Sequence, residues 1–378
     1  EGVTLEPGDP DASYFVELIR HDGEPRMPYK QDPLPLEKVA LIERWVKEGA
    51  KYDGGKPDED WTAVLRKNRP VNIPESYPVA VPITALAFSP DGSNLAASGY
   101  HEVNLWKLGD GSLASRLRGL AERVYAIAYS PDGKFLATAS GDPGQFGSVK
   151  LWSSEPNGTA KIVRELAELP DSAYAVVFSP DGKLVAAGGA DRAIRIWETA
   201  TGKQLALIED HADWVLDLAF SPDGKRLASA SRDKTSKVFD VAKAEALVTF
   251  PGHAETVNTV AFAADGKSVA TGGRDNQVRI WNPDDDAKAI RAIGGFGAEV
   301  LKIRFTPDGK TLAACGADKQ VRLFNPTNGA AIKTLEGHTD WVYSLAISPD
   351  GKTLASGGFD GQVRIWNLAD GTSQKSLQ

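Results

Sequence analysis

The chain contains very little cysteine and no long hydrophobic run. Its 378 residues include one cysteine, Cys315, which excludes an internal disulfide, a cysteine-rich zinc site and the CxxCH attachment of a haem within this chain. No apolar run approaches the roughly 18 residues that a membrane-spanning helix needs. There is also no excess of positive charge, since 43 Lys and Arg face 51 Asp and Glu and the formal net charge is −8. These absences favour an ordinary globular protein with no membrane span, and they argue against a nucleic-acid-binding surface.

The acidic charge is concentrated near the N-terminal end. Residues 1–60 hold 15 Asp and Glu against 8 Lys and Arg, whereas the rest of the chain holds 36 against 35. The chain therefore has a short acidic region and a much longer, nearly neutral one. The glycine- and proline-containing stretch at residues 54–58 marks the boundary between them. We predict a helical part over residues 1–55, a linker over residues 56–80 and a repeat domain over residues 81–378.

The longer region repeats one turn signal seven times. A Pro-Asp-Gly tripeptide, with Ala-Asp-Gly in the fifth copy, follows an apolar residue and a small one. The apolar residues are Phe88, Tyr129, Phe178, Phe220, Phe262, Phe305 and Ile347, spaced by 41, 49, 42, 42, 43 and 42 residues. Such a period is typical of a solenoid or a propeller. Because Pro presets φ and Gly accepts the left-handed conformation, each copy predicts a tight hairpin between two strands.

Each period also predicts four short strands. In the last period they are residues 342–347, 353–358, 362–366 and 372–377, which contain alternating or small apolar residues. Four-stranded units repeated around an axis form a β-propeller, which leaves only short, protected edges. We therefore predict an all-β fold, a seven-bladed propeller, with a small helical part in front of it.

The repeats resemble those of the WD-repeat family over residues 80–378. Gly-His opens a repeat at His253 and His338, and His211 stands at the same place without the glycine. The resemblance implies a buried hydrogen-bond relay in which His, Ser or Thr, Asp and an aromatic residue lock each blade. Its members in blades 4, 5 and 7 are His211, Ser229, Asp233 and Phe239, then His253, Thr271, Asp275 and Trp281, then His338, Ser356, Asp360 and Trp366.

The other blades depart from this pattern. Blades 3 and 6 keep Asp191 and Asp318 but have alanine at the hydroxyl position, so we expect packing to hold them together. Blade 1 has Tyr100 in the place of the aspartate. Blade 2 carries an insertion over residues 141–148, which is a candidate contact surface.

A structural role for the relay is favoured over catalysis or metal binding. Each His–Asp pair belongs to a different blade, so the three pairs cannot converge on one ion. Buried polar groups in strands need hydrogen-bond partners, which the relay supplies. Cys315 is expected to be a packed core thiol, and residues 284–286 lack the alternating ligand spacing of a calcium loop. The sequence thus predicts no catalytic residue and no metal site.

Loops at the rim of a propeller are the usual place for function on a rigid scaffold. By the resemblance, the residue before the first strand of a blade and the residue before the relay aspartate lie on one open face. On blades 4, 5 and 7 these positions hold Trp214, Arg232, Arg274, Trp341 and Phe359. Aromatic residues mixed with arginine have the composition of an interface hot spot. The alternative is that the tryptophans pack locally against neighbouring loops.

The acidic region predicts two short helices joined by a loop. The first begins with Asp9 as its cap and ends near Arg20, with Phe15, Leu18 and Ile19 on its apolar face. The second spans residues 36–48, and its apolar stripe is Leu36, Val39, Ile42, Trp45 and Val46. A piece of this size cannot bury a sufficient core by itself. We expect it either to dock on the propeller or to be half of a domain.

Residues 4–55 resemble the C-terminal half of c-type cytochrome domains of the planctomycete kind, which are often fused to WD-repeat propellers. The resemblance rests on the strings PGDPDASYF, EPRMPY and PLPLEKVALIERWVKEGA. It implies that Met27 is a candidate axial haem ligand, that haem c is a cofactor only if a CxxCH segment precedes this chain, and that the protein is extracytoplasmic, in the periplasm. The alternative is that Met27 is a packed loop residue in a haem-free module.

Two functions follow from these patterns. The first is a non-catalytic scaffold whose propeller face binds a protein partner, supported by the repeats and by the lack of a nucleophile elbow, a metal cluster or a phosphate loop. The alternative is the propeller-bearing part of an extracytoplasmic c-type cytochrome that transfers electrons. An enzyme built in the propeller channel is the weakest interpretation, because no acidic pair or His cluster recurs toward the channel.

Overall fold

The computed structural model describes residues 4–22, 27, 32–50, 73–74, 77, 79–154 and 160–377. The chain divides into two compact units, Glu1–Val71 and Asn72–Gln378. Each unit is described separately below. The predicted linker over residues 56–80 lies mostly outside the described residues. Within the described ranges, no helix is long and apolar enough to cross a membrane.

The first unit contains two helices, α1 (Tyr14–Arg20) and α2 (Leu36–Lys47). The predicted start of the first helix at Asp9 is wrong, because the helix begins after Ser13. Asp9 instead closes a short turn before the helix, where its Oδ1 accepts hydrogen bonds from the amides of Asp11 and Ala12 at 3.0 and 3.2 Å. The predicted second helix is confirmed to within a residue, and Gly49 follows it with φ of 97°.

The buried faces of these helices differ in part from the predicted ones. Residues Val16, Leu18 and Ile19 of α1 and Val39 and Val46 of α2 are buried. Two residues of the predicted apolar stripe face solvent instead, since Leu36 is 85% and Trp45 40% exposed. An ion pair between Arg20 and Glu43 at 2.6 Å joins the two helices.

The second unit is built of 27 strands. In chain order they are β1 Leu86–Phe88, β2 Asn94–Ser98, β3 Tyr100–Lys107, β4 Leu113–Tyr129, β5 Phe135–Asp142, β6 Phe146–Ser154, β7 Ala160–Leu169, β8 Ala173–Phe178, β9 Leu184–Gly189, β10 Ile194–Glu198, β11 Gln204–Ile208, β12 Val215–Phe220, β13 Arg226–Ser231, β14 Ser236–Asp240, β15 Glu245–Phe250, β16 Val257–Phe262, β17 Val269–Gly273, β18 Val278–Asn282, β19 Lys288–Ile293, β20 Val300–Phe305, β21 Leu312–Gly316, β22 Val321–Phe324, β23 Ala331–Leu335, β24 Val342–Ile347, β25 Thr353–Gly358, β26 Val363–Asn367 and β27 Ser373–Leu377.

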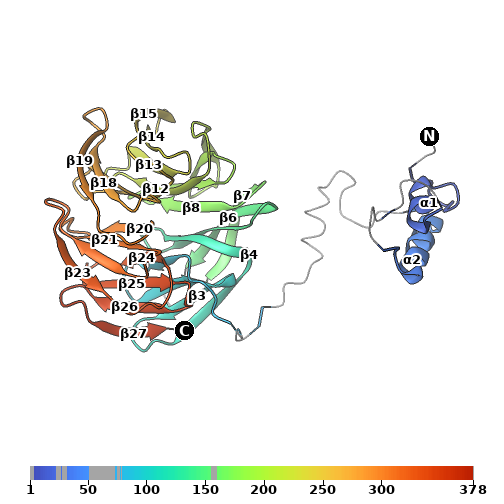
Figure 1. The fold of residues 1–378 in the computed structure, drawn as a ribbon, viewed down its shortest axis with the longest axis horizontal. Helices are drawn as coiled ribbons and strands as arrows, with labels where there is room; N and C mark the ends of the chain where they lie inside the picture. The colour runs from blue at the N-terminus through green and yellow to red at the C-terminus, as the bar shows by residue number, and fades with distance from the viewer. Residues whose placement is uncertain are drawn as a thin grey trace. The chain divides into compact units, whose positions relative to one another are not determined.

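These strands form one seven-stranded sheet and five four-stranded sheets, in which strands adjacent in the chain pair with each other. The seven-stranded sheet contains two repeats, because the 17-residue strand β4 pairs with β3 through its first part and with β5 through its last part. The chain therefore has seven groups of four antiparallel strands, which we call blades 1 to 7 in chain order. Figure 1 shows them following one another around a centre.

The predicted hairpin turns between the first and second strands of the blades are confirmed. Each turn glycine has a left-handed conformation, and the φ angles range from 68° at Gly266 to 72° at Gly133. In the first turn, Ser89 Oγ donates to Asp91 Oδ1 at 2.5 Å and accepts from the amide of Asn94 at 2.9 Å. Five other blades repeat this pair of hydrogen bonds with a serine or threonine. Blade 5 has Ala263 there and lacks them.

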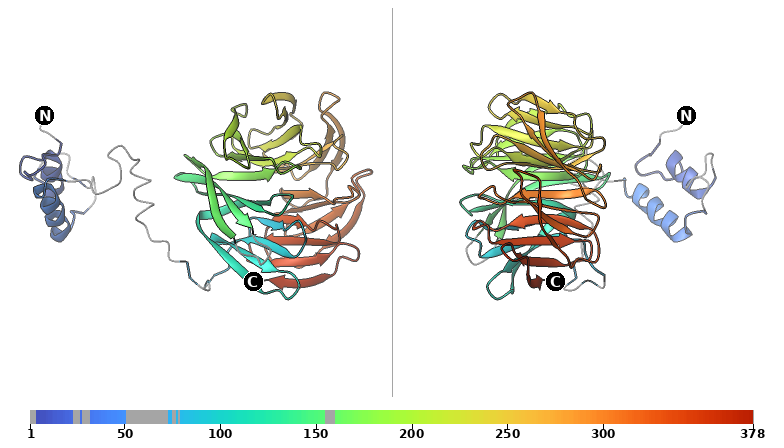
Figure 2. Two further views of the ribbon diagram at one scale, coloured as in Figure 1. Left: turned by 180° about the vertical axis from the view of Figure 1, so that it is seen from behind. Right: turned by 60° about the vertical axis from the view of Figure 1, so that its left-hand side comes forward.

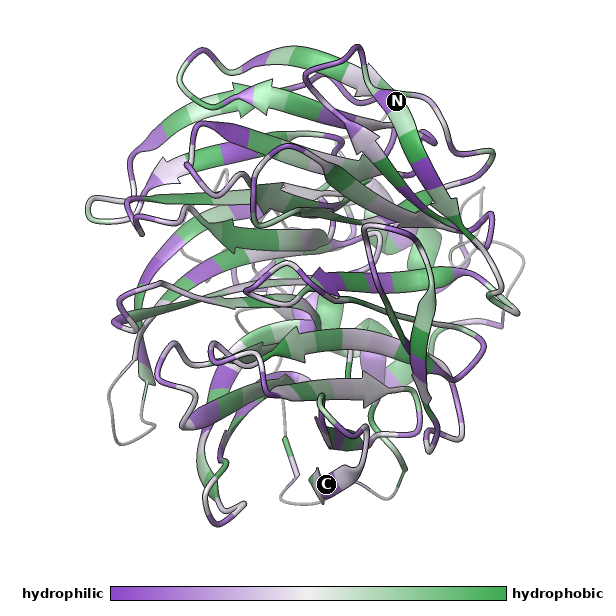
Figure 3. Ribbon diagram, turned by 90° about the vertical axis from the view of Figure 1, so that its left-hand side faces the viewer, coloured by the Kyte–Doolittle hydropathy of each residue, from purple (hydrophilic) through white to green (hydrophobic). Residues whose placement is uncertain are grey.

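Apolar cores fill the spaces between neighbouring blades. One such core joins Ile280 of blade 5 to Val300 and Leu312 of blade 6. Another joins blade 1, through Leu95, to blade 7, through Ala355. Figure 3 shows hydrophobic colour concentrated in the strands and hydrophilic colour in many of the loops.

The first and last blades also share hydrogen bonds. The amide of Ile83 donates to the carbonyl of Gly358 at 3.0 Å, and Ser344 Oγ donates to the carbonyl of Ile83, also at 3.0 Å. The turn of blade 7 lies against that of blade 1, since a Cβ added to Gly92 would be 3.8 Å from Cδ of Pro349. The two ends of the strand unit therefore meet, as the view from behind in Figure 2 illustrates.

Candidate functional site

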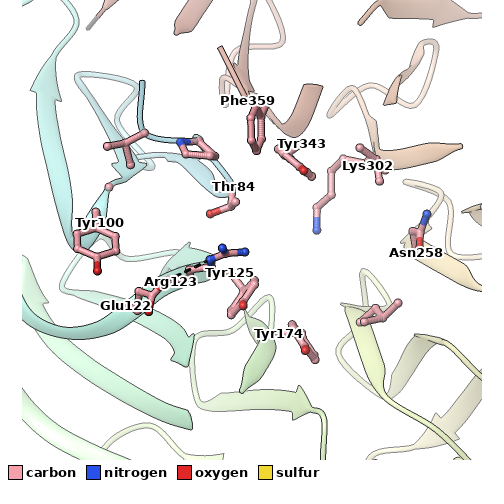
Figure 4. A pocket seen from close by; sticks show the side chains of 15 residues that line it. Thr84, Tyr100, Glu122, Arg123, Tyr125, Tyr174, Asn258, Lys302, Tyr343 and Phe359 are labelled. Carbon is pink, nitrogen blue, oxygen red and sulfur yellow. Dashed lines mark ion pairs between the residues drawn. The ribbon is translucent and has the colours of Figure 1, made fainter. Parts of the chain in front are cut away.

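A pocket of about 490 Å³ opens where the first strands of the blades come together (Figure 4). Every blade contributes one equivalent residue to the pocket wall, which is the second residue after its rim position, as Leu216 is after Trp214. These seven residues are Thr84, Tyr125, Tyr174, Leu216, Asn258, Leu301 and Tyr343. None of these seven residues was predicted from the sequence, although they recur with the same spacing as the turns. Convergence of seven equivalent positions on one pocket makes it the centre of this face of the unit.

Two aromatic clusters border this pocket. In the first, the rings of Tyr125 and Tyr174 are 4.8 Å apart and those of Tyr174 and Trp214 are 5.4 Å apart. The guanidinium of Arg232 lies 4.4 Å from the Trp214 ring, a cation–π distance. The predicted pair Trp214 and Arg232 is therefore brought together, and Arg232 keeps a side-chain exposure of 48%.

The second cluster lies on blade 7. Tyr343 is 6.1 Å from Trp341 and 6.2 Å from Phe359, measured between ring centres. Trp341 is 42% exposed and Phe359 is 48% exposed, so both present apolar surface to solvent. Arg274, the fifth residue predicted for the interface, pairs with Glu299 of the next blade at 3.3 Å. The predicted set thus occupies two aromatic clusters and a separate ion pair.

Burial keeps the pocket tyrosines protonated. It raises the pKa of Tyr174 to about 12 and also raises the pKa of Tyr125 and of Tyr343. Neutral phenols can donate hydrogen bonds to a ligand. The pocket therefore combines apolar ring surface with hydroxyl donors, which is the composition expected of a specific binding site.

Lys302, which lines the pocket, belongs to a buried polar network. Lys302 Nζ lies 3.0 Å from Asp217 Oδ1, and an Arg304 nitrogen lies 3.6 Å from Asp217 Oδ2. Thr259 Oγ1 donates to the same carboxylate at 2.8 Å. Burial acts to raise the pKa of Asp217, but the charges of Lys302 and Arg304 outweigh it, so the net pKa is lowered. Burial lowers the pKa of Lys302, against the influence of Asp217.

The insertion of blade 2 extends the hairpin of β5 and β6 beside this face. Asp142 Oδ1 accepts from the amide of Glu122 at 2.5 Å, and the amide of Gly144 donates to Asp171 at 3.0 Å. A Cβ on Gly141 would lie 2.4 Å from Cα of Ser172, so glycine is needed for this close approach. The insertion is therefore fastened to blade 3, and it does not project as a separate loop.

The structure assembles the complete four-residue relay in blade 7. Asp360 accepts from His338 Nδ1 at 3.0 Å, and Ser356 Oγ lies 2.8 Å from His338 Nε2. Trp366 Nε1 donates to the same Ser356 Oγ at 2.8 Å. Burial lowers the pKa of His338, which favours the neutral imidazole. The ionised carboxylate of Asp360 can only accept, so the proton lies on Nδ1. Nε2 is then an acceptor, and the Ser356 hydroxyl donates to it.

Blades 4 and 5 assemble the first three members of the relay. His211 lies 2.7 Å from Asp233 and 2.6 Å from Ser229. In blade 5 the corresponding contacts of His253, with Asp275 and Thr271, measure 3.0 and 2.8 Å. The charge of each aspartate is satisfied locally, so these residues stabilise their blades and do not face the pocket.

The aromatic member differs between these two blades. Trp281 Nε1 is buried and has no hydrogen-bond partner within the described residues. Its ring stacks on Phe250 with a centre-to-centre distance of 5.0 Å. Phe239 of blade 4 lies edge-on to His211 at 6.2 Å. The predicted bond of Trp281 to the relay is therefore absent. Blade 2, for which no relay was predicted, has a bond from Trp152 Nε1 to Thr138 at 3.0 Å.

Blades 3 and 6 replace the relay with an ion pair. Asp191 pairs with Arg195 at 2.6 Å, and Asp318 pairs with Arg322 at 2.6 Å. All four side chains are at least four-fifths buried, the most exposed being that of Arg195 at 19%. These blades therefore use an ion pair in addition to the packing expected from the sequence. The arginine four residues after the aspartate was visible in the sequence and is the signal that was missed.

Blade 1 also uses an ion pair. Glu102 is fully buried, and Arg116 Nη2 and Nε donate to its two carboxylate oxygens at 2.6 and 2.8 Å. Tyr77 Oη lies 3.3 Å from the same carboxylate, and Tyr100, at the aspartate position, lines the pocket. A bidentate arginine–carboxylate pair is among the stronger charged hydrogen bonds.

The remaining candidate residues do not line the pocket. Among the described residues, no cluster of His, Cys, Asp and Glu could hold a metal ion. Cys315 is buried, its Sγ contacts the carbonyl of Val342 at 3.2 Å, and burial raises the pKa of the thiol. Asp284 pairs with Arg226 at 2.8 Å. Met27 is 39% exposed, and its carbonyl lies 3.0 Å from His21 Nε2.

Seven four-stranded repeats with these turns and relays define a WD-repeat protein. The chain belongs to the family described as "WD domain, G-beta repeat". The matched segments are residues 77–107, 111–146, 163–198, 202–240, 244–282, 288–325 and 329–367. The match begins at residue 77, so the cytochrome resemblance of residues 4–55 stays a prediction.

Curated proteins with similar sequences share only parts of this chain. Intraflagellar transport protein 122 homolog of Danio rerio is 38% identical over 76 residues, which are 20% of this chain and 6% of that protein. Nuclear distribution protein nudF 1 of Talaromyces marneffei is 33% identical over 140 residues, 36% of this chain and 29% of that protein. The chain thus spans less than a third of the length of these relatives.

Proposed function

We propose that this chain is a non-catalytic interaction scaffold, a closed seven-bladed propeller that binds a protein partner over the central pocket. The observation that carries the proposal is the convergence of one residue from every blade on that pocket, which two aromatic clusters border. The cluster on blade 7 exposes Trp341 and Phe359, and the other one is half-buried. Exposed aromatic surface with arginine beside it is the composition of an interface hot spot. The relays and ion pairs are satisfied within their blades, which leaves them a stabilising role.

The relatives support a scaffold in general terms. Their names describe transport and distribution, and the WD repeats of this family are mainly known as interaction modules. Fold alone does not determine function. The proposal therefore rests on the pocket of this chain and names no particular partner.

The test is capture of a partner from the source organism with the full chain and its variants. Phe359→Ala and Trp341→Ala remove exposed aromatic surface at the pocket, and we expect each to reduce the recovered partner by about tenfold, as for a hot-spot residue. Ile332→Ala is the matched control, because Ile332 is also half exposed, at 53%, but lies on the outer strand β23. Equal recovery by all three variants would refute the proposed face.

We keep electron transfer as a second proposal for the first unit. The described part of that unit buries five apolar side chains, Val16, Leu18, Ile19, Val39 and Val46, which is a small core and is consistent with part of a larger domain. The chain by itself does not fit a covalently attached haem, since Cys315 is buried in β21. The proposal therefore needs a CxxCH segment before residue 1, with Met27 as candidate axial ligand and a location in the periplasm.

An absorption spectrum and an intact mass of protein from the native source decide this point. A haem band together with mass beyond the 378 residues would support the second proposal. A mass equal to that of this chain and no haem band would remove it. The result does not bear on the propeller face.

A further inference from the structure

We propose that the central pocket binds the side-chain carboxylate of an acidic residue in a partner peptide, with an adjacent apolar residue against the aromatic rings. This inference rests on the proposed function and names the chemistry of the partner. Lys302 and Arg123 are the groups that would receive the carboxylate. Both line the pocket, and Figure 4 shows the two cationic ends extending into the same space.

Lys302 is a nearly buried ammonium group with donors to spare. Its side chain is 19% exposed, and its Nζ lies 3.0 Å from Asp217 Oδ1. An ammonium group has three N–H donors. Within the described residues one of them is used by Asp217, so the other two are available to a ligand in the pocket. A desolvated ammonium with unused donors favours an anion.

Counted over the residues that line the pocket, positive charge exceeds negative charge by one, because Lys302 and Arg123 face one acid, Glu122. Asp217 is one carboxylate between two cations, Lys302 and Arg304. Arg123 is opposed by Glu122, but that contact is a loose 3.7 Å and the Arg123 side chain is 61% exposed. Among the described residues, Glu122 is the one acidic residue that lines the pocket. An excess of about one charge matches a carboxylate better than a phosphate group, which carries roughly two at neutral pH.

Glu299 lies near the pocket but does not line it. Its Oε2 accepts from Asn258 Nδ2 at 3.2 Å and lies 3.3 Å from Arg274, so it is satisfied at the rim. A cationic ligand would meet Lys302 directly and be repelled. The pocket thus selects the sign of the charge that enters it.

The rest of the pocket fits the backbone and neighbours of an acidic residue. A volume of about 490 Å³ holds one acidic side chain and one apolar neighbour. The tyrosine hydroxyls supply neutral donors, and the ring surfaces of Tyr343 and Phe359 supply apolar contact. A peptide in which a Glu is followed by an aromatic or aliphatic residue would use both the polar donors and the apolar ring surfaces of the pocket.

The experiment measures how strongly the full chain retains matched peptide libraries. Each library is acetylated and amidated at its ends, has uncharged random flanks, and has Glu, Gln, Lys or phosphoserine at its centre. A fifth library has the Gln centre and a free C-terminal carboxylate. We expect the Glu library to be retained about tenfold better than the Gln library at low salt, with the difference reduced at high salt.

Two variants connect the preference to these residues. Arg123→Gln is expected to reduce the Glu preference by about fivefold and Lys302→Met to abolish it. Arg118→Gln is the matched control, since Arg118 is an exposed arginine on the same strand, β4, and does not line the pocket. Because Lys302→Met leaves Asp217 without its nearest cation, a thermal melt checks its folding, and Arg123→Gln tests the proposal independently.

Several results would overturn the inference. Equal retention of the Glu and Gln libraries, or no retention of any, would do so. Stronger retention of the phosphoserine library would reassign the site to phosphopeptides, and stronger retention of the free-acid library would reassign it to a C terminus. Uncharged peptides retained by wild type but lost with Phe359→Ala would overturn the carboxylate while leaving the proposed binding face intact.

Discussion

The hydrogen bond between Trp366 and Ser356 in blade 7 has no counterpart at Trp281 in blade 5, and this difference yields a measurable prediction. In blade 7, Ser356 Oγ donates to His338 and accepts from Trp366 Nε1, both at 2.8 Å, and it is fully buried. Ser356→Ala leaves two buried polar groups without partners. At about 1–2 kcal/mol for each group, the loss of stability should be about 3 kcal/mol.

A double-mutant cycle isolates the bond to the indole. Ser356→Ala and Trp366→Phe should each destabilise the protein, and together by less than their sum, with a coupling of about 1–2 kcal/mol. Thr271→Val and Trp281→Phe form the matched cycle in blade 5, where Trp281 Nε1 has no partner among the described residues. Its coupling should be below about 0.5 kcal/mol.

Urea unfolding followed by far-ultraviolet circular dichroism measures both cycles, because this signal does not depend on the tryptophan that is removed. The comparison requires one cooperative transition with a common slope for all variants. Equal coupling energies in the two blades would refute the assignment of the hydrogen bond to blade 7. No coupling in either blade would show that the Trp366 contact contributes packing only.

Three further perturbations follow from the same geometry. Ala264→Pro should raise stability by about 0.5–1 kcal/mol, because the other turns of this kind carry proline and the substitution restricts the unfolded chain; a lower urea midpoint would contradict it. Burial lowers the pKa of His253 and His338 below the unfolded-state value near 6.5. At pH values below about 6.5 the unfolded chain therefore binds more protons than the folded one, so stability should fall as the pH falls from about 7 to 5. A urea midpoint that stays constant over that range would refute this linkage. Arg322→Gln should cost about 2 kcal/mol, because it leaves the Asp318 carboxylate, whose side chain is 9% exposed, without its 2.6 Å partner; an unchanged unfolding midpoint would show that the pair contributes nothing.

The local structure of the repeats was predictable because it depends on short-range chemistry. The Pro-Asp-Gly turns were found correctly, since left-handed glycine and a preset proline φ act within four residues. The end of α2 followed from Gly49 in the same way. The start of α1 was not predicted correctly, because an aspartate such as Asp9 can cap a turn as well as a helix. Only the folded structure shows that Asp9 closes a turn and that the helix begins after Ser13.

Some side-chain contacts between the strands of a blade were predicted correctly from the sequence, and others were not. The His–Asp pairs were placed together because their residue types fit one hydrogen-bonding pattern, as with His338 and Asp360. The ion pairs at Asp191 and Asp318 were missed, although an arginine stands four residues after each. The stacking of Trp281 on Phe250 was not predictable from the sequence, because it is a contact between neighbouring blades.

The sequence by itself determined the number of repeats, the four-strand unit and the turns, because each depends on residues that are neighbours in the chain. Only the tertiary structure decided that Tyr125, Tyr174, Tyr343 and Lys302 line one pocket. Alternation along a strand shows which residues share a face, but not which face borders an open space. That space exists because seven separate blades meet at one centre, and its chemistry is therefore a property of the assembled unit.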